Sequence, residues 1–311
     1  MIVRWGVAAL PALAGDRPLV VASRRWHHVL DAADRWEEIP SHRIQVPEGV
    51  DMIVAVGGGS AIDTGKAASA ASGLPLVSVP TTYSGAEWTE FFGVRDPDRK
   101  MRGGGAGANL RAIVYEPALT LDLPRAETVG TALNALAHCA EALYVDGHNA
   151  DADAEALDGA RLIGTWLPQV VERPGDLAAR TELLRGACHA GAALGKSFLA
   201  LGHALAQGLG GRYGAPHGAL NALTLPLALR FNEPVAGDAI ARLGAALGTD
   251  DPASGVEQLA RLGGFERLRE LGIPEEAPAD VAQAVAERPG AKANPRPVTP
   301  VDVEELLRSI W

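Results

Sequence analysis

The sequence has few cysteines, few aromatic residues and no long apolar segment. Its 311 residues include only two cysteines, Cys139 and Cys188, which lie far apart and outside any CxxC spacing. This pattern excludes a disulfide framework and a zinc knuckle, and it favours a reducing cytoplasm. Gly, Pro or a charged residue interrupts every apolar stretch before it reaches the length of a membrane span, about 18 residues. We therefore expect a cytoplasmic protein without a membrane partner.

Basic segments are also missing. The net charge of −10 and the pI near 5.3 repel nucleic acids and anionic membranes, and no run of Lys and Arg makes a local exception. The hydrophobic content of 47% is ample for buried cores, and the length suits two domains of ordinary size. A small molecule is thus the expected partner.

Short apolar runs bounded by turn residues occur in the first third of the chain and predict buried parallel strands. They are Leu19–Ala22, Met52–Val56, Leu76–Val79 and Ala112–Tyr115. Helical stretches between them, Trp26–Glu38 and Ala61–Ser72, give the alternation typical of a doubly wound, Rossmann-like α/β sheet. Residues 95–111 are rich in glycine and charge, which predicts a loop.

The sequence changes character near Leu123. From there on, Ala, Leu, Glu and Arg recur with helical periodicity, and β-branched runs are almost absent. Pro124 follows the last extended segment, and a short helix is expected at Val301–Ile310. We therefore predict a nucleotide-binding α/β domain over residues 1–122 and an all-helical catalytic domain over residues 123–311.

Three successive glycines, Gly57, Gly58 and Gly59, and then Ser60 follow an apolar strand and precede a helix. Glycines let the backbone approach a pyrophosphate closely, and the following helix directs N–H groups and its positive dipole end at the anion. The general fingerprints do not fit, because Ile62 stands at the last glycine of GxGxxG and Ser60 breaks the P-loop spacing. A tight turn without a ligand is the alternative, although such turns rarely need three glycines.

Hydroxyl groups are concentrated after the next strand, in VPTTYSGAEWT. Thr81, Thr82, Ser84 and Thr89 could bind phosphate, ribose or carboxamide groups at the carboxyl end of the sheet, where open α/β folds bind ligands. A hydroxyl-stabilised turn and helix cap is the alternative for this segment.

Three histidines and one asparagine form the other candidate site. Asn134 and His138 are four residues apart, so they share one face of a helix, and His203 and His217 bracket a glycine-rich turn. Three imidazoles suggest a divalent metal site, but an amide stands where a carboxylate would normally complete it. For each histidine taken alone a hydrogen-bonded structural role is the more frequent case, and only their occurrence together in these motifs favours a site.

Six motifs together resemble the iron-containing alcohol dehydrogenase superfamily, and most closely its maleylacetate reductase branch. They are GGGSAIDTGKAAS, VPTTYSGAEWT, ALTLDLP, NALAHCAEALY, GHALAQGLGGRYGAPHG and ANPRPVTPVDVEELL, in order from about Asp51 to the C-terminus. The resemblance implies a dehydroquinate synthase-like fold with a nucleotide-binding domain and a helical domain. It also implies an NAD(P)H-dependent reductase of a carbonyl substrate that assembles as a homodimer.

The resemblance assigns residues to the cofactor. Gly57, Gly58, Gly59 and Ser60 would hold the pyrophosphate, and Asp63, Thr81, Thr82, Thr89 and Lys100 would surround the nicotinamide and its ribose. Where NAD-preferring relatives carry an acidic residue after the first long strand, this chain has Ser23, Arg24 and Arg25. Two arginines would accommodate a 2′-phosphate, so we expect NADPH to be preferred slightly over NADH.

The resemblance also assigns the histidine motif. In metal-dependent relatives an Asp and three His bind iron or zinc, and these positions correspond to Asn134, His138, His203 and His217. Maleylacetate reductases share the Asn and work without a metal, so we expect these four residues to be catalytic and no metal to be resident. If iron or zinc does bind weakly, the three histidines would hold it. Another family histidine, beside the nicotinamide, corresponds here to Gln207, which leaves the proton relay open.

The substrate is expected to be a maleylacetate-like keto acid or an aldehyde. A dicarboxylate would need basic partners, for which Lys196 and Arg212 are candidates, although a surface role is the stronger alternative for both. Three other interpretations remain open: a metal-dependent alcohol dehydrogenase, a dehydroquinate synthase-like lyase, and a non-catalytic cofactor-binding homologue. Asn134 and Gln207 motivate the last of these.

Overall fold

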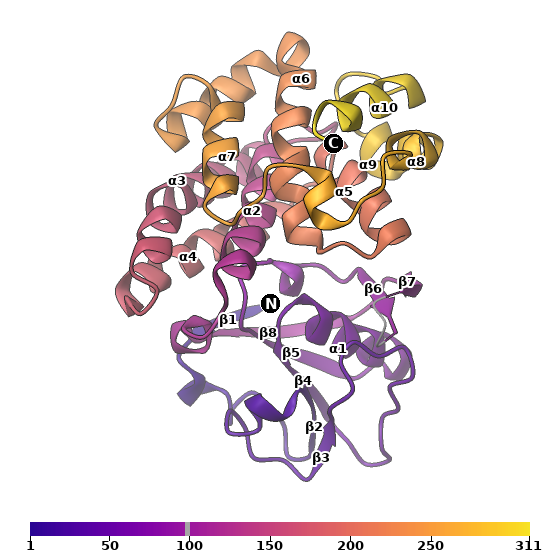
Figure 1. Ribbon diagram of the computed structural model, residues 1–311. Helices are drawn as coiled ribbons and strands as arrows, with labels where there is room; N and C mark the ends of the chain where they lie inside the picture. The colour runs from indigo at the N-terminus through magenta and orange to yellow at the C-terminus, as the bar shows by residue number, and fades with distance from the viewer. Residues whose placement is uncertain (97–99) are drawn as a thin grey trace. The chain divides into compact units, whose positions relative to one another are not determined.

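The computed structural model describes residues 1–96 and 100–311. The chain divides into two compact units, Met1–Asp122 and Leu123–Trp311, of which the first contains a parallel sheet and the second is helical (Figure 1). The predicted class, an α/β unit followed by a helical unit, is confirmed. No helix in the described part of the chain is long and apolar enough to cross a bilayer.

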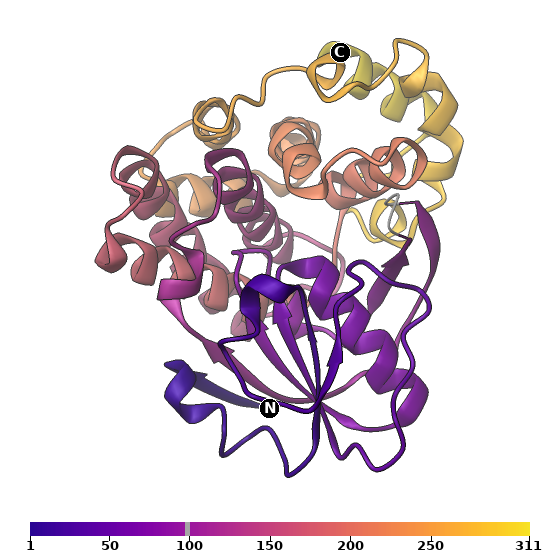
Figure 2. The ribbon, with the colours of Figure 1, turned by 60° about the horizontal axis from the view of Figure 1, so that its bottom comes forward.

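A six-stranded parallel sheet forms the first unit, and its strands fan out in Figure 2. In spatial order the strands are β1 (Ile2–Trp5), β8 (Asn109–Tyr115), β5 (Pro75–Pro80), β4 (Met52–Gly57), β2 (Pro18–Ala22) and β3 (Asp34–Trp36). The four predicted strands are the inner ones, and they are confirmed. The two edge strands were not predicted, because they are short and only partly buried and so lack the continuous apolar run of an inner strand.

The two faces of this sheet are covered differently. Helix α1 (Gly59–Ser72) lies on one face, where Ala68 packs with Ile53 and Leu76. On the other face Leu10 and Trp26, which lie in turns and 3-10 segments, pack on the strands. Among the described residues of this unit, α1 is the only α-helix.

The helix predicted at Trp26–Glu38 is wrong. The segment has a 3-10 turn at Arg24–Trp26, then irregular chain, and then β3, in which Trp36 pairs with Val21 of β2. Once Asp34–Trp36 joins the sheet, the chain left between the strands is shorter than the dozen or so residues of a helical crossover. Its apolar side chains Val29 and Leu30 pack on the sheet without forming a helix.

The loop predicted over residues 95–111 is also partly wrong, and its residues 97–99 lie outside the described residues. Strand β7 (Met101–Gly105) pairs antiparallel with β6 (Phe92–Arg95), and β8 begins at Asn109. Strand β7 contains three glycines and is exposed throughout, so it lacks the side-chain alternation by which a strand is identified in a sequence.

The second unit is helical, as predicted, and its described residues contain no strand. Its helices are α2 (Arg125–Ala142), α3 (Ala150–Glu172), α4 (Leu177–Leu194), α5 (Leu201–Tyr213), α6 (His217–Leu247), α7 (Pro252–Arg261), α8 (Ala277–Ala286), α9 (Pro289–Lys292) and α10 (Pro300–Ser309). Helix α2 is the central element: it is buried from Thr128 to Ala142 except at Thr131, and it packs against α3, α4 and α6. The side chains of α2, α5 and α6 form the histidine site.

Candidate active site

The glycine turn connects β4 to α1 at the carboxyl end of the sheet. Gly57 has a φ of 150°, and a Cβ there would lie 2.7 Å from the Cβ of Ala61. A Cβ on Gly58 would lie 2.9 Å from Cγ2 of Thr82. These two positions therefore require glycine, and the N-cap residue Gly58 leaves the start of α1 without a side-chain cap, as an anion-binding helix terminus requires.

Two further predicted groups lie around this turn. The amide of Thr81 donates to the carbonyl oxygen of Gly57 at 3.0 Å, and the hydroxyl of Thr82 donates to that of Ser84 at 3.3 Å. Ser60, in the first turn of α1, is exposed. The structure thus brings the glycines, Ser60, Thr81 and Thr82 into one polar turn region.

Asp63 and Thr89 meet at Lys66, which was not predicted as a site residue. The ammonium of Lys66 is buried, lies 3.8 Å from Asp63, and donates to the hydroxyl of Thr89 at 3.3 Å and the carbonyl oxygen of Phe91 at 2.8 Å. Burial raises the pKa of Asp63 to about 6 and lowers the pKa of Lys66. Lys66 therefore holds the loop that carries Thr89 against α1.

Ser23 begins the 3-10 turn after β2, but the arginines beside it are engaged differently from each other. Arg24 pairs with Glu37 at 2.7 Å, whereas the guanidinium of Arg25 lies over the ring of Trp26 at 4.2 Å. Lys100 directly precedes β7, where its backbone amide donates to Oδ1 of Asp96 at 2.9 Å and its side chain is exposed. No bond among the described residues connects Lys100 to the glycine turn.

The second unit brings Asn134, His138, His203 and His217 together, and we call these four residues the histidine cluster. Asn134 and His138 come from α2, His203 from α5 and His217 from the first residue of α6. The rings of His138 and His203 stack with centroids 4.7 Å apart, and the ring of His217 lies 5.9 Å from that of His203. Burial, and then the neighbouring imidazoles, lower the pKa of His138 well below its usual value, so His138 is neutral.

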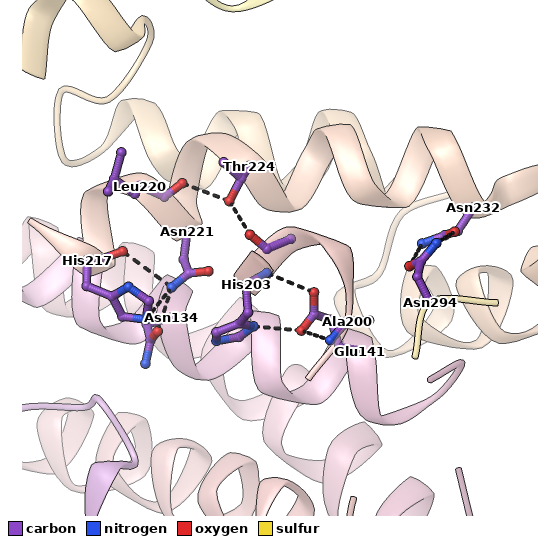
Figure 3. A network of polar contacts seen from close by, with 11 residues as sticks. Asn134, Glu141, Ala200, His203, His217, Leu220, Asn221, Thr224, Asn232 and Asn294 are labelled. Carbon is purple, nitrogen blue, oxygen red and sulfur yellow. Dashed lines mark hydrogen bonds and ion pairs between the residues drawn. The ribbon is translucent and has the colours of Figure 1, made fainter. Parts of the chain in front are cut away.

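Glu141 holds His203 in place (Figure 3) and was not predicted. This fully buried carboxylate accepts from Nδ1 of His203 at 2.7 Å and from the backbone amides of His203 and Ala200 at 3.1 and 2.8 Å. Nδ1 of His203 faces the carboxylate, so Nε2 points away from Glu141, and this buried atom has no hydrogen-bond partner. Glu141 follows His138 by three residues on α2, a spacing that could have indicated it.

Asn221 links the other two members of the cluster and was also not predicted. Its amide nitrogen donates to Oδ1 of Asn134 at 2.7 Å and lies 3.0 Å from Nε2 of His217 (Figure 3). Asn221 lies 87 residues from Asn134 in the sequence, so no local pattern connects the two. It does share a face of α6 with His217, four residues earlier, and this spacing could have indicated it. One amide thus bonds two of the four residues at the expected metal-ligand positions.

These donors do not fit a tightly held iron or zinc ion. An amide replaces the carboxylate that would offset the charge of the cation, and Asn221 directs its N–H groups at two of the atoms that would have to coordinate it. Among the described residues, no group of three or more His, Cys, Asp or Glu side chains has an arrangement suited to a metal.

The two basic residues considered for a dicarboxylate are both paired with acids. Lys196 lies 3.0 Å from Glu155, and Arg212 lies 2.7 Å from Asp280, and both cations are largely exposed. Both residues therefore make the ion pairs of surface cations. This surface role was the stronger alternative in the sequence.

Comparisons with known proteins agree with this architecture. Residues 41–114 match the iron-containing alcohol dehydrogenase family, and residues 128–311 match the C-terminal domain of the Fe-containing alcohol dehydrogenase family. Maleylacetate reductase from Burkholderia cepacia is 38% identical over 96% of this chain and 84% of its own length. The crystal structure of maleylacetate reductase from Agrobacterium tumefaciens has a TM-score of 0.87 at 27% identity, covering 100% of this chain and 95% of that one.

A putative alcohol dehydrogenase from Ralstonia eutropha JMP134 has a TM-score of 0.90 at 32% identity, covering 100% of this chain and 95% of that one. The fold and the sequence thus define an NAD(P)-dependent oxidoreductase. The chain belongs to the iron-containing alcohol dehydrogenase family, and its similarity to maleylacetate reductases places it on that branch.

Proposed function

We propose that this protein reduces the carbonyl group of a maleylacetate-like oxo acid with NADPH or NADH and without a metal ion. The contacts of Asn221 carry the proposal. Its amide nitrogen bonds to Oδ1 of Asn134 and Nε2 of His217, which are two of the atoms that would have to coordinate a metal. The substrate class follows from the maleylacetate reductases that resemble this chain over most of its length. The metal-dependent alcohol dehydrogenase is the other candidate, and it is favoured only by the family's usual metal.

The reaction needs a group that stabilises and protonates the developing alkoxide. The nicotinamide, when bound, supplies the hydride to the carbonyl carbon. His203 supplies the proton from Nε2 to the carbonyl oxygen, which gives the alcohol, while Glu141 stabilises the charged imidazole at Nδ1. Neutral His138 and the amide of Asn134 orient the oxygen or a water beside it.

The cofactor binds at the glycine turn of the first unit. Gly57, Gly58, Gly59 and Ser60 hold the pyrophosphate, and Asp63, Thr81, Thr82 and Thr89 surround the nicotinamide ribose. NADPH is preferred, because Arg25 has no acidic partner in the described residues and is available for a 2′-phosphate, whereas Arg24 is paired with Glu37.

The Asn134→Asp variant tests the metal part of the proposal. We expect wild-type protein to contain far less than one iron or zinc per chain by elemental analysis, and the variant to gain zinc affinity in calorimetry, because a carboxylate is restored. Asn149→Asp is the control, since it adds the same charge at the N-cap of α3, away from the cluster. Unchanged zinc affinity in Asn134→Asp would remove the argument from the missing carboxylate.

A fluorescence titration of the wild-type protein with NADPH and NADH tests the cofactor part. A lower dissociation constant for NADPH is expected, and the preference should disappear in Arg25→Ala. A preference for NADH would contradict the role given to Arg25.

A further inference from the structure

Arg288 is a partly buried cation with no role in the proposed reaction. It precedes α9 as its N-cap residue, and the segment from α8 to α9 packs against α5, the helix that carries His203. Nη1 of Arg288 lies 3.4 Å from Oε1 of Gln207, and Nη2 lies 3.3 Å from the carbonyl oxygen of the same residue. The guanidinium therefore lies on α5 at the position where the family's additional histidine is replaced by Gln207.

This guanidinium has no counter-ion in the described part of the chain. Arg212 and Arg230 each pair with a carboxylate within 2.7 Å, whereas both contacts of Arg288 are long and go to neutral oxygens of Gln207. Its Nε is buried without a partner, and burial lowers the pKa of Arg288. A cation that is partly withdrawn from water and has no anion beside it can be stabilised by an anionic ligand.

The position of Arg288 relates it to the reacting group. Gln207 follows His203 by four residues on α5, so the two side chains share one helix face and are separated by one turn, about 6 Å along the axis. A substrate with its carbonyl oxygen at Nε2 of His203 would have to extend along this one turn of α5 to place a second group at the residue that Arg288 contacts.

We propose that Arg288 binds a carboxylate of the substrate and so selects short oxo acids over uncharged aldehydes. The inference rests on the proposed carbonyl reduction and adds the residue that sets its substrate class. A guanidinium fits a carboxylate with two parallel hydrogen bonds, and a bound carboxylate would satisfy the unpartnered Nε or the two terminal nitrogens. Glycine at position 208 assists this arrangement, since a Cβ there would lie 2.3 Å from Cγ2 of Val285 and push the α8–α9 segment away.

The test compares maleylacetate with its dimethyl ester, which has the same carbonyl and carbon skeleton but no charge. In Arg288→Met, we expect KM for maleylacetate to rise about 10- to 100-fold, the usual size of a lost charged hydrogen bond, with kcat changed much less. The kinetics of the ester should not change. Arg288→Lys should recover part of the loss. Arg212→Met, which removes an exposed cation of α5 that is paired with Asp280, should leave the kinetics of both substrates unchanged.

Equal effects of Arg288→Met on the two substrates, or no effect on either, overturn the role of Arg288. If wild-type protein reduces neither substrate, the proposed function fails, and calorimetric binding of maleylacetate then decides the role of Arg288 separately. Loss of that binding in Arg288→Met would support the carboxylate site, whereas equal binding by both proteins, or no binding by the wild type, would contradict it. An unchanged melting temperature of the variant shows that its fold is intact.

Discussion

The two units build their sites from different parts of the chain. In the first unit the glycine turn presents backbone, and its essential positions are those where a side chain would not fit, as at Gly58 beside Thr82. In the second unit the histidine cluster consists of side chains that are held by other side chains, as Glu141 holds His203. The proposed binding of the cofactor therefore depends on a local backbone conformation, and the proposed chemistry depends on contacts between distant residues.

This difference predicts which property each substitution changes. A change in the glycine turn should mainly affect cofactor affinity, whereas a change in the histidine cluster should mainly affect the rate of the chemical step. The following predictions test this division from the largest expected effect to the smallest.

Substitution of His203 by Ala should have the largest effect. We expect kcat to fall about 10²- to 10⁴-fold, because the proton donor is lost, while the dissociation constant of NAD(P)H changes much less, because the glycine turn proposed to hold the pyrophosphate is left intact. Steady-state kinetics and fluorescence titration measure the two quantities. A kcat close to that of wild type would show that His203 is structural only.

Glu141→Gln is the matched variant for this prediction. It keeps the size of the side chain but removes the charge that stabilises a protonated His203. Its kcat should lie between those of wild type and His203→Ala, and a slower variant than His203→Ala would show that Glu141 matters mainly for folding.

Substitution of Gly58 by Ala should weaken cofactor binding more than it slows the chemical step. The added Cβ would lie 2.9 Å from Cγ2 of Thr82, so the turn must shift, and losing one hydrogen bond to the charged pyrophosphate costs about 10- to 100-fold in affinity. We expect a higher dissociation constant for NAD(P)H and a smaller change in kcat at saturating cofactor. Gly175→Ala is the control, since a Cβ there meets nothing within 4 Å. Equal cofactor affinity in both variants would contradict the importance of the turn.

The smallest expected effect concerns stability of the first unit against pH. The pKa of Asp63 is raised to about 6 by burial, so between about pH 4 and pH 6 folded protein keeps a proton that unfolded protein has lost. The free energy of unfolding therefore decreases as pH rises through this range, by about 1–2 kcal/mol. Asp63→Asn should abolish this decrease in denaturant titrations at pH 4 and pH 7.

Asp51 gives the matched control with the opposite sign. The backbone amides of Asp16 and Arg17 donate to its carboxylate and lower its pKa. Its contribution to stability is thus present at neutral pH and is lost as the pH falls through its folded pKa. The same pH dependence in Asp63→Asn and Asp51→Asn would show that these two carboxyl groups do not cause it.

The sequence predicted what is determined locally. The inner strands and α1 were predicted because their residues are buried as continuous apolar or amphipathic runs, and the glycine turn was recognised because it directly follows β4. Strand β3 was missed because its three residues depend on pairing with β2, and the wrong helix at Trp26–Glu38 followed from that omission.

The histidine cluster shows the same limit. Its four residues were predicted from their motifs, and the structure places them together. Asn221 and Arg288 were not predicted, because their importance comes from contacts with residues that are 87 and 81 positions away in the chain. Such contacts depend on how α2, α5, α6 and the α8–α9 segment pack, which no local pattern in the sequence specifies.

The most direct measurement of the central claim is the reduction of maleylacetate by wild-type protein after exhaustive treatment with a chelator, with iron and zinc determined in the same sample. We predict that the oxidation of NADPH or NADH continues at the untreated rate with far less than one metal ion per chain. Loss of activity on chelation, with recovery on addition of stoichiometric iron or zinc, would contradict the claim.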